Sequence, residues 1–183
     1  TLGAEPRCEA TIASTTQMVD PTTKTWATDL LAAANLPTDV LLPIDSPGVT
    51  VGTVDPDRLP ADVPSPEIVL PASHDTAAAV AGLPLGRTNR LFISTGTWFI
   101  TGLELDHPEQ SQQAFEIGAS NELGIDDTVR LLKNINGFFL LEECRRSWEQ
   151  SGKNTSYDAI FGAVDIAGPI GPLVDPDDDA FGI

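Results

Sequence analysis

Prolines interrupt the first half of the chain at short intervals. Six of them fall within 24 residues, with Gly48 and Gly52 between them, at positions 43, 47, 56, 60, 64 and 66. Proline lacks the backbone N–H that helix interiors and central strands need. This segment can therefore form only loops and extended chain around one short strand, expected over residues 49–54, and the longer elements must lie elsewhere.

The chain before residue 43 contains one expected strand and one expected helix. Residues 8–14 are typical of a short strand. Residues 27–34 favour a helix that Thr25 caps and that ends at Asn35 and Pro37. These elements are short, so they must pack on other parts of the chain.

The chain after residue 66 is expected to alternate strands with helices. An apolar run over residues 68–70 leads to an alanine-rich stretch, 77–81, with the composition of a helix. Further strands are expected over 91–93, 98–105, 115–119 and 128–132, and a helix over 157–164. A short helix is also expected in the polar segment 106–113.

The clearest helix opens at Asn136 and Gly137. It carries an apolar stripe at spacings of three and four residues, formed by Phe138, Leu141, Cys144 and Trp148. Such a stripe marks one face of an amphipathic helix, and that face is expected to be buried.

The order of these elements predicts an α/β fold, a mixed sheet with flanking helices. Composition changes between residues 77 and 86, and the charged pair Arg87 and Arg90 follows. We therefore expect parts of two domains, residues 1–86 and residues 87–183.

The charge balance restricts the partners. Ten basic residues stand against 27 acidic ones, a net charge of −17. Nucleic-acid affinity depends on Lys and Arg contacts to phosphates, so a nucleic-acid partner is excluded. A small phosphate ligand remains compatible, because backbone N–H groups at turns can hold an anion.

The sequence contains no apolar run long enough for a membrane span and no signal-peptide pattern, so we expect a soluble cytoplasmic protein without a membrane partner. Cys8 and Cys144 lie far apart and lack metal-type spacing. In that compartment buried free thiols are favoured over a disulfide.

Asp75 is the candidate general base. It follows Ser73 and His74 at an expected strand-to-helix turn, where a carboxylate can take a proton from a hydroxyl. The three neighbours point in different directions, which argues against a hydrolase triad. The alternative is that Asp75 only caps the alanine-rich helix.

The turn Ser94–Thr97 is the candidate phosphate loop. Gly96 lets the backbone approach a ligand closely, and the hydroxyl and N–H groups supply donors. The alternative is an ordinary hairpin turn, because small polar residues are common there.

The acidic residues near the end of the chain, Asp175, Asp177, Asp178 and Asp179, are interpreted as a solvated loop. Calcium loops need alternating ligands and a closing Glu, which this run lacks. No metal site is predicted.

Several segments together resemble the FGGY carbohydrate kinases, and within that family the L-rhamnulose kinases. They are CEATIASTTQMVDPTTKTW, PGVTVG, VLPASHDTAAAVAG, FISTGTWFITGLEL and TVRLLKNINGFFLLEECRRSW. The resemblance implies an actin-like, ribonuclease-H-type fold in two domains. It also implies that ATP and Mg²⁺ are used to phosphorylate a ketose, L-rhamnulose to L-rhamnulose 1-phosphate, in L-rhamnose catabolism.

The resemblance also implies site residues. Asp75 matches the catalytic base, and His74, Asp75 and Thr76 match the sugar-contacting triplet. Asn134 matches a second sugar contact, expected at the start of the long helix or as its cap. Thr97 matches an ATP-contacting threonine, and Gly96, in the same turn, is expected to bind the cofactor by allowing its close approach. Glu142 stands where the family has a nucleotide-contacting Gln, and a carboxylate cannot donate as that amide does.

Other positions depart from the family. Glu122, Leu123 and Gly124 stand where Glu-Gly-Gly is usual, and Asn136 is a further departure. The family's first phosphate loop and its nucleotide-base pocket are not in this sequence, so we expect an incomplete piece that is inactive alone and that self-associates through unpaired sheet edges. The alternatives are a non-catalytic sugar-binding or scaffold module, or another FGGY sugar kinase.

Overall fold

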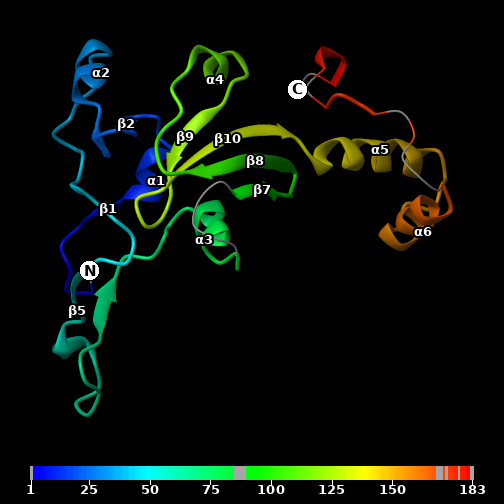
Figure 1. Cartoon of the computed structure of the whole chain (residues 1–183). Coiled ribbons are helices and arrows are strands. Elements are labelled where there is room, and N and C mark those ends of the chain that lie inside the picture. The colour runs from blue at the N-terminus through cyan, green and yellow to red at the C-terminus, as the bar shows by residue number, and fades with distance from the viewer. Residues whose placement is uncertain (1, 85–89, 168–170, 172, 177, 182–183) are drawn as a thin grey trace. The chain divides into compact units, whose positions relative to one another are not determined.

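The computed structural model describes residues 2–84, 90–167, 171, 173–176 and 178–181 (Figure 1). Up to residue 84 its elements are short, including those of the proline-rich segment 43–66. They are β1 (Cys8–Glu9), α1 (Ala10–Ser14), β2 (Val19–Asp20), β3 (Thr25–Trp26), α2 (Thr28–Ala33), β4 (Ile44–Asp45), β5 (Thr50–Thr53), a 3-10 turn (Pro56–Arg58), β6 (Glu67–Val69) and α3 (Asp75–Ala81). The expected strand at 49–54 is confirmed as β5.

Longer strands and helices follow residue 90. They are β7 (Arg90–Ser94), β8 (Trp98–Leu105), α4 (Gln112–Glu116), β9 (Ser120–Leu123), β10 (Val129–Asn136), α5 (Phe138–Gln150), α6 (Tyr157–Ala167) and a 3-10 turn (Asp179–Phe181). The strands expected at 91–93, 98–105 and 128–132 and the helix expected at 157–164 are confirmed.

Four of these strands form one sheet, in the order β7-β8-β10-β9. Strands β9 and β10 are antiparallel, with Leu123 opposite Val129. The earlier strands pair in twos: β1 with β4 in parallel, and β2 with β3 and β5 with β6 antiparallel. The mixed α/β class expected from the sequence is therefore confirmed.

A buried hydrophobic cluster joins helix α1 to the four-stranded sheet. It consists of Ala10, Leu123 and Val129, with Val19 and Ile44 packed against it. Gly102 of β8 lets strands β8 and β10 approach closely, because a Cβ there would lie 2.5 Å from the Leu131 carbonyl oxygen of β10. A larger residue would push β8 away from β10.

Packing divides the chain into two compact units. The first unit is Thr1–Phe92 with Gly102–Lys133, and the second is Ile93–Thr101 with Asn134–Ile183. The domain boundary expected near residue 86 lies outside the described residues. The kinase domains 1–86 and 87–183 therefore stay a prediction.

The prediction of a strand over residues 8–14 is correct for Cys8 and Glu9 and wrong for the residues after them. Residues Ala10–Ser14 form helix α1, because the Glu9 carboxylate accepts hydrogen bonds from the N–H groups of Thr11 and Ile12 and caps the helix. A glutamate is a rare cap, so the local sequence gave little sign of it.

Two further local predictions are wrong. Residues 115–119 do not form a strand: Phe115 lies in α4 with 78% of its surface exposed, and Ser111 caps that helix by accepting from Ala114 N–H. Thr25 does not cap α2, because it pairs with Asp20 in the β2–β3 ribbon. The N-cap of α2 is Ala27, which makes no side-chain bond.

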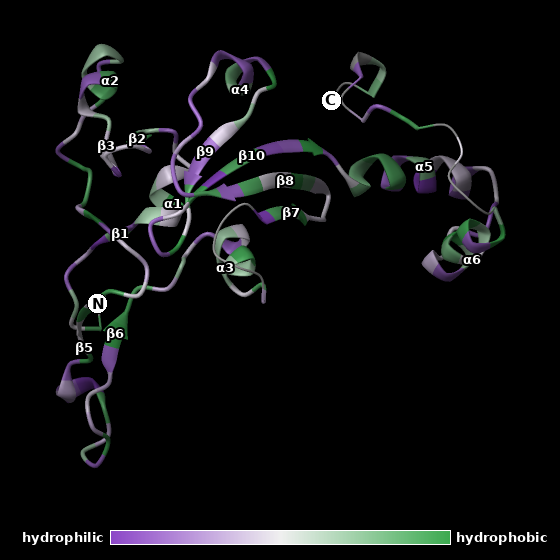
Figure 2. Cartoon of the chain, in the orientation of Figure 1, coloured by the Kyte–Doolittle hydropathy of each residue, from purple (hydrophilic) through white to green (hydrophobic). Residues whose placement is uncertain are grey.

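Helix α5 forms as predicted, but its apolar stripe is not buried in this chain. Phe138 and Trp148 are 46% and 37% exposed, and α5 and α6 contain no buried residue. Figure 2 shows green, hydrophobic segments on both helices. Periodicity identifies the apolar face, whereas burial requires a partner that packs on it.

Both cysteines are free, as predicted, but neither is buried: Cys8 is partly buried and Cys144 is exposed. Partial burial raises the pKa of the Cys8 thiol, and the negative charge of Glu9 raises it further. Among the described residues, no helix has the length and apolar character needed to cross a bilayer.

Candidate functional site

The candidate base lies at the first position of helix α3. His74 is the N-cap of that helix and makes no side-chain capping bond, and Asp75 is the first helical residue. The Asp75 side chain is 95% exposed. Asp75 is therefore not the N-cap residue of α3, although its Oδ1 accepts from a first-turn N–H, that of Thr76. Its carboxylate is open to a ligand.

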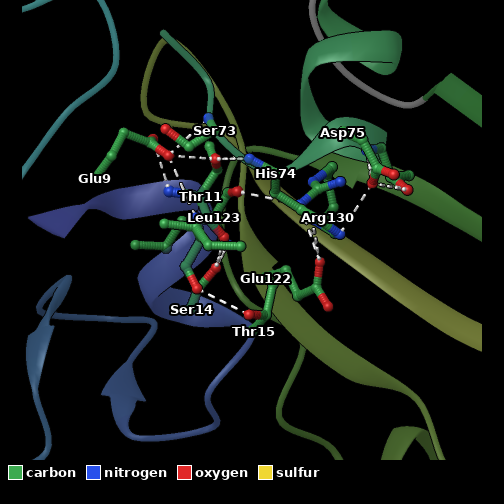
Figure 3. A network of polar contacts seen from close by, with 12 residues as sticks. Glu9, Thr11, Ser14, Thr15, Ser73, His74, Asp75, Glu122, Leu123 and Arg130 are labelled. Atoms are coloured by element: carbon green, nitrogen blue, oxygen red, sulfur yellow. Dashed lines mark hydrogen bonds and ion pairs between the residues drawn. The ribbon is translucent and has the colours of Figure 1, made fainter. Parts of the chain in front are cut away.

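Glu9 holds the turn that precedes Asp75 (Figure 3). Its buried carboxylate accepts from the backbone N–H of Ser73 at 2.9 Å and from the Thr11 hydroxyl at 2.6 Å. The same carboxylate caps α1 through the N–H of Thr11 at 2.8 Å. One side chain thus fixes the start of α1 and the turn before the candidate base.

Thr11 and Ser14 extend this attachment to the sheet. The Thr11 hydroxyl accepts from the His74 N–H at 3.2 Å, and the Thr11 carbonyl accepts from the Ser14 hydroxyl at 2.9 Å. The Ser14 hydroxyl oxygen in turn accepts from the Leu123 N–H of β9 at 2.9 Å. Because these groups are largely buried, the backbone at 73–74 is held against α1 and β9.

The His74 imidazole is held by two charged residues of the sheet. Arg130 Nη2 lies 3.0 Å from His74 Nδ1 and 2.9 Å from Glu122 Oε2, and Glu122 Oε2 lies 3.3 Å from His74 Nδ1. The Arg130 side chain is 1% exposed. Burial lowers the pKa of Arg130, and the nearby carboxylates, Glu122 first, oppose that shift.

The two oxygens of the Asp75 carboxylate differ in their contacts. Oδ1 accepts from the Thr76 N–H at 2.6 Å and from the Thr76 hydroxyl at 3.3 Å, and His74 Nε2 lies 3.5 Å from it. Asp75 Oδ2 has no hydrogen-bond partner among the described residues. Oδ1 is thus the anchored oxygen, and Oδ2 is the one free to accept a proton from a bound hydroxyl.

The turn Ser94–Thr97 belongs to the second unit, where it contacts the start of α5. The carbonyl oxygens of Gly96 and Thr97 accept from the N–H groups of Phe138 at 3.0 Å and Phe139 at 3.1 Å. Gly137 permits this approach, because a Cβ there would lie 2.8 Å from the Gly96 oxygen. The turn is therefore attached to the start of the helix through two backbone hydrogen bonds.

Gly96 itself has space around it. A Cβ at this position would meet only the Trp98 carbonyl oxygen, at 3.4 Å, and Gly96 does not have the positive φ that demands glycine. What glycine supplies here is open space beside the turn. The expected role of Gly96 beside a ligand stays a prediction.

Asn134 does not lie where it was expected. It is an exposed residue within strand β10, and the N-cap of α5 is Gly137. Both the position at the helix start and the capping alternative are therefore wrong. Strand β10 continues for two residues past Asn134, to Asn136.

Glu142 of α5 forms a clamp with Arg145 and Tyr157. Its two carboxylate oxygens accept from Arg145 Nη1 at 2.9 and 2.8 Å, and Oε1 also accepts from the Tyr157 hydroxyl at 2.5 Å. The Arg145 guanidinium lies 4.3 Å above the Tyr157 ring. The Tyr157 bond, then that of Arg145, lowers the pKa of Glu142, and the pKa of Tyr157 is raised mainly by its bond to Glu142.

The sequence analysis missed Glu9, Thr11 and Arg130, and it noted Glu122 only as part of a departure. Glu9 and Arg130 lie 64 and 56 residues from the turn they contact. The sequence offered one indication of Arg130, which is that it is a charged residue in the otherwise apolar strand segment 129–132.

The described residues contain no group of three or more His, Cys, Asp or Glu side chains arranged to hold a metal ion. Of the acidic run near the end of the chain, Asp177 lies outside the described residues.

Among curated proteins, the chain is similar to rhamnulokinases. It is 36% identical to that of Bacteroides thetaiotaomicron over 174 residues, which cover 94% of this chain and 35% of that protein. It is 37% identical to that of Pectobacterium atrosepticum, over 95% of this chain and 34% of that protein. The chain thus spans about a third of the length of these relatives. No family model matches the chain.

Solved structures support the fold. A xylulose kinase from Rhodospirillum rubrum matches 93% of this chain and 34% of its own, with a TM-score of 0.69 and 14% identity. One from Brucella ovis matches 84% of this chain and 31% of its own, with a TM-score of 0.65. At such identity the likeness concerns the fold alone. Together with the relatives above, these matches confirm the resemblance expected from the sequence: this chain is a homologue of the rhamnulokinases, among the FGGY carbohydrate kinases, and matches about a third of such a protein.

Proposed function

We propose that this chain carries the proton-accepting base of a kinase that phosphorylates a ketose with ATP. L-rhamnulose is the favoured ketose and L-rhamnulose 1-phosphate the product, a step of L-rhamnose catabolism. The observation that supports this most directly is the Asp75 carboxylate, exposed and anchored through one oxygen, in a chain similar to rhamnulokinases.

In the proposed reaction, the sugar hydroxyl oxygen attacks the γ-phosphorus of ATP and the bond to the ADP oxygen breaks. Asp75 Oδ2 takes the proton of that hydroxyl. Phosphoryl transfer relies mainly on positioning and charge neutralisation, and a general base contributes about 10² to 10⁴ in rate. His74, Thr76 and Asn134 are the proposed sugar contacts.

Gly96 and Thr97 are the proposed contacts to ATP, and the open space at Gly96 is compatible with a phosphate group. Glu142 fits the nucleotide role poorly, because its carboxylate already accepts from Arg145 and Tyr157. Magnesium would be held largely by phosphate oxygens, since this ion commonly binds through one or two carboxylates together with substrate phosphates.

The finer expectations belong to the same proposal. The fold would be of the actin-like, ribonuclease-H type, with residues 1–86 in the sugar-side domain and 87–183 in the nucleotide-side domain. The protein would act in the cytoplasm. Unpaired edges of the sheet would favour self-association of the chain alone.

The test is a chimera in which this chain replaces the matched 174 residues of the Bacteroides thetaiotaomicron rhamnulokinase. ADP release is measured with ATP, Mg²⁺ and either L-rhamnulose or D-xylulose. We expect turnover with L-rhamnulose, lowered at least 10²-fold by Asp75→Asn, while sugar affinity by calorimetry changes little. The chain by itself should release no ADP above background.

Three outcomes would contradict the proposal. A folded chimera that binds sugar without turnover indicates a sugar-binding module. Preference for D-xylulose indicates another sugar kinase. Undiminished kcat in Asp75→Asn removes the base assignment.

A further inference from the structure

We infer that Arg130 is a positioning residue for the candidate base: it holds the His74 imidazole in the tautomer whose Nε2–H faces the Asp75 carboxylate. The inference rests on the proposed function, because its purpose is to orient Asp75. The residues involved all belong to the first unit.

The tautomer follows from what each group can donate. A guanidinium has N–H donors and no acceptor, and it stays protonated in proteins. Arg130 Nη2 lies 3.0 Å from His74 Nδ1, so Nδ1 must be the acceptor and carry no hydrogen. A neutral imidazole then has its hydrogen on Nε2, the atom 3.5 Å from Asp75 Oδ1.

The position of Glu122 by itself would favour the other tautomer of His74, but the distances around Nδ1 argue against that tautomer. Glu122 Oε2 lies 3.3 Å from His74 Nδ1, which by itself would favour a hydrogen on Nδ1. That hydrogen would point at the Arg130 N–H, a donor facing a donor at a shorter distance. With Nδ1 bare, the two hydrogens of Nη2 serve its two nearer acceptors, Glu122 Oε2 at 2.9 Å and His74 Nδ1 at 3.0 Å, and the Leu123 carbonyl oxygen at 3.5 Å is the most distant of the three.

The burial of Arg130 is hard to explain as a contribution to stability. Its Nε and Nη1 atoms are buried and have no hydrogen-bond partner among the described residues. A buried charge is costly unless its hydrogen bonds are complete. The one nitrogen with partners, Nη2, is the one that reaches His74, which points to a role beyond packing.

The consequence for Asp75 concerns its geometry. Thr76 donates its N–H and its hydroxyl to Oδ1, and His74 Nε2–H faces the same oxygen from 3.5 Å, so these contacts restrain the carboxylate from one side. This leaves Oδ2 as the oxygen directed at a ligand. With the other tautomer, a bare Nε2 would face Oδ1, and two lone pairs would repel each other.

The experiment is long-range ¹H–¹⁵N NMR of the chain labelled at its imidazoles, at a pH where they are neutral. The chain has two histidines, and the second, His107, is exposed, so it is an internal control. His107 should show averaged nitrogen shifts from mixed tautomers. His74 should show a protonated Nε2 and an unprotonated Nδ1.

The variants are Arg130→Met, and Arg130→Met with Glu122→Met. The second removes both partners of the ion pair, a change that proteins often tolerate with little loss of stability, so it yields a folded sample if the single variant does not. In Arg130→Met the hydrogen of His74 should move to Nδ1, because Glu122 Oε2 remains 3.3 Å from it. In the double variant, which has neither partner, His74 should shift toward the averaged pattern of His107. Arg146→Met, at an exposed position of α5, should leave His74 unchanged.

A wild-type His74 with its hydrogen on Nδ1 or with averaged shifts would overturn the inference. So would an unchanged His74 pattern in the folded double variant. The NMR readout needs no turnover, so these results stand apart from the kinase assay. In the active chimera Arg130→Met should lower kcat by about one to two orders of magnitude with little change in KM.

Discussion

Replacing Glu9 with Ala should both destabilise the first unit and release the turn that precedes the candidate base. Glu9 is 4% exposed and accepts from Thr11, Ile12 and Ser73. Loss of the cap of α1 costs about 1 kcal/mol. Thr11 is fully buried, and stranding its hydroxyl together with the Ser73 N–H, which both donate to Glu9, adds about 2 kcal/mol. The expected cost is therefore about 3 kcal/mol of unfolding free energy.

Glu9→Gln should cost less, because the amide oxygen can replace Oε2, which accepts from the Ser73 N–H, the Thr11 hydroxyl and the Ile12 N–H. The amide NH₂ would then face the Thr11 N–H, which Oε1 now accepts. One bond is lost and two donors oppose each other, so we expect about half the cost of Glu9→Ala.

The assay combines urea unfolding with hydrogen exchange of the Ser73 and His74 amides. In Glu9→Ala both amides should lose protection, since Ser73 loses its acceptor and His74 is held through Thr11. Glu5→Ala is the matched control, because the Glu5 side chain is 84% exposed and its change should cost under about 0.5 kcal/mol. A cost of Glu9→Ala near that of the control, with both amides still protected, would refute the reasoning.

Three further predictions concern other parts of the chain. Gly102→Ala should destabilise by about 1 to 3 kcal/mol because its Cβ would overlap the Leu131 oxygen, whereas Gly162→Ala in α6 should stabilise by about 0.5 to 1 kcal/mol, both checked by urea unfolding. The folded pKa of Glu142 is lowered and that of Tyr157 is raised. The clamp should therefore weaken as pH falls through the folded pKa of Glu142 and as pH rises through the folded pKa of Tyr157. Circular dichroism should record the loss of the clamp at alkaline pH, and Tyr157→Phe should abolish that pH dependence. Gly96→Val should fold normally and weaken ATP binding to the chimera by calorimetry; equal affinity would remove the turn from the ATP site.

The sequence predicted well those elements that depend on neighbouring residues. The stripe from Phe138 to Trp148 produced helix α5, and small polar residues at 94–97 produced the turn before β8. Local patterns failed at two helix starts: Glu9 is an unusual cap, and Ser111 is an ordinary one that the strand expected at 115–119 overlooked. Residues 10–14 became a helix because Glu9 caps them, and residues 112–116 because Ser111 does.

The resemblance carried by SHDTA and the long helix was enough to identify the family and to single out Asp75. Only the tertiary structure decided how Asp75 is held, because its neighbours His74 and Ser73 receive their partners from strands and helices 56 to 64 residues away. Helix propensity and apolar periodicity act over a few residues, whereas the meeting of Glu9, Arg130 and His74 depends on the packing of α1 and β10. Hydrogen-bond geometry then fixes which oxygen of Asp75 is anchored, and no sequence pattern encodes that.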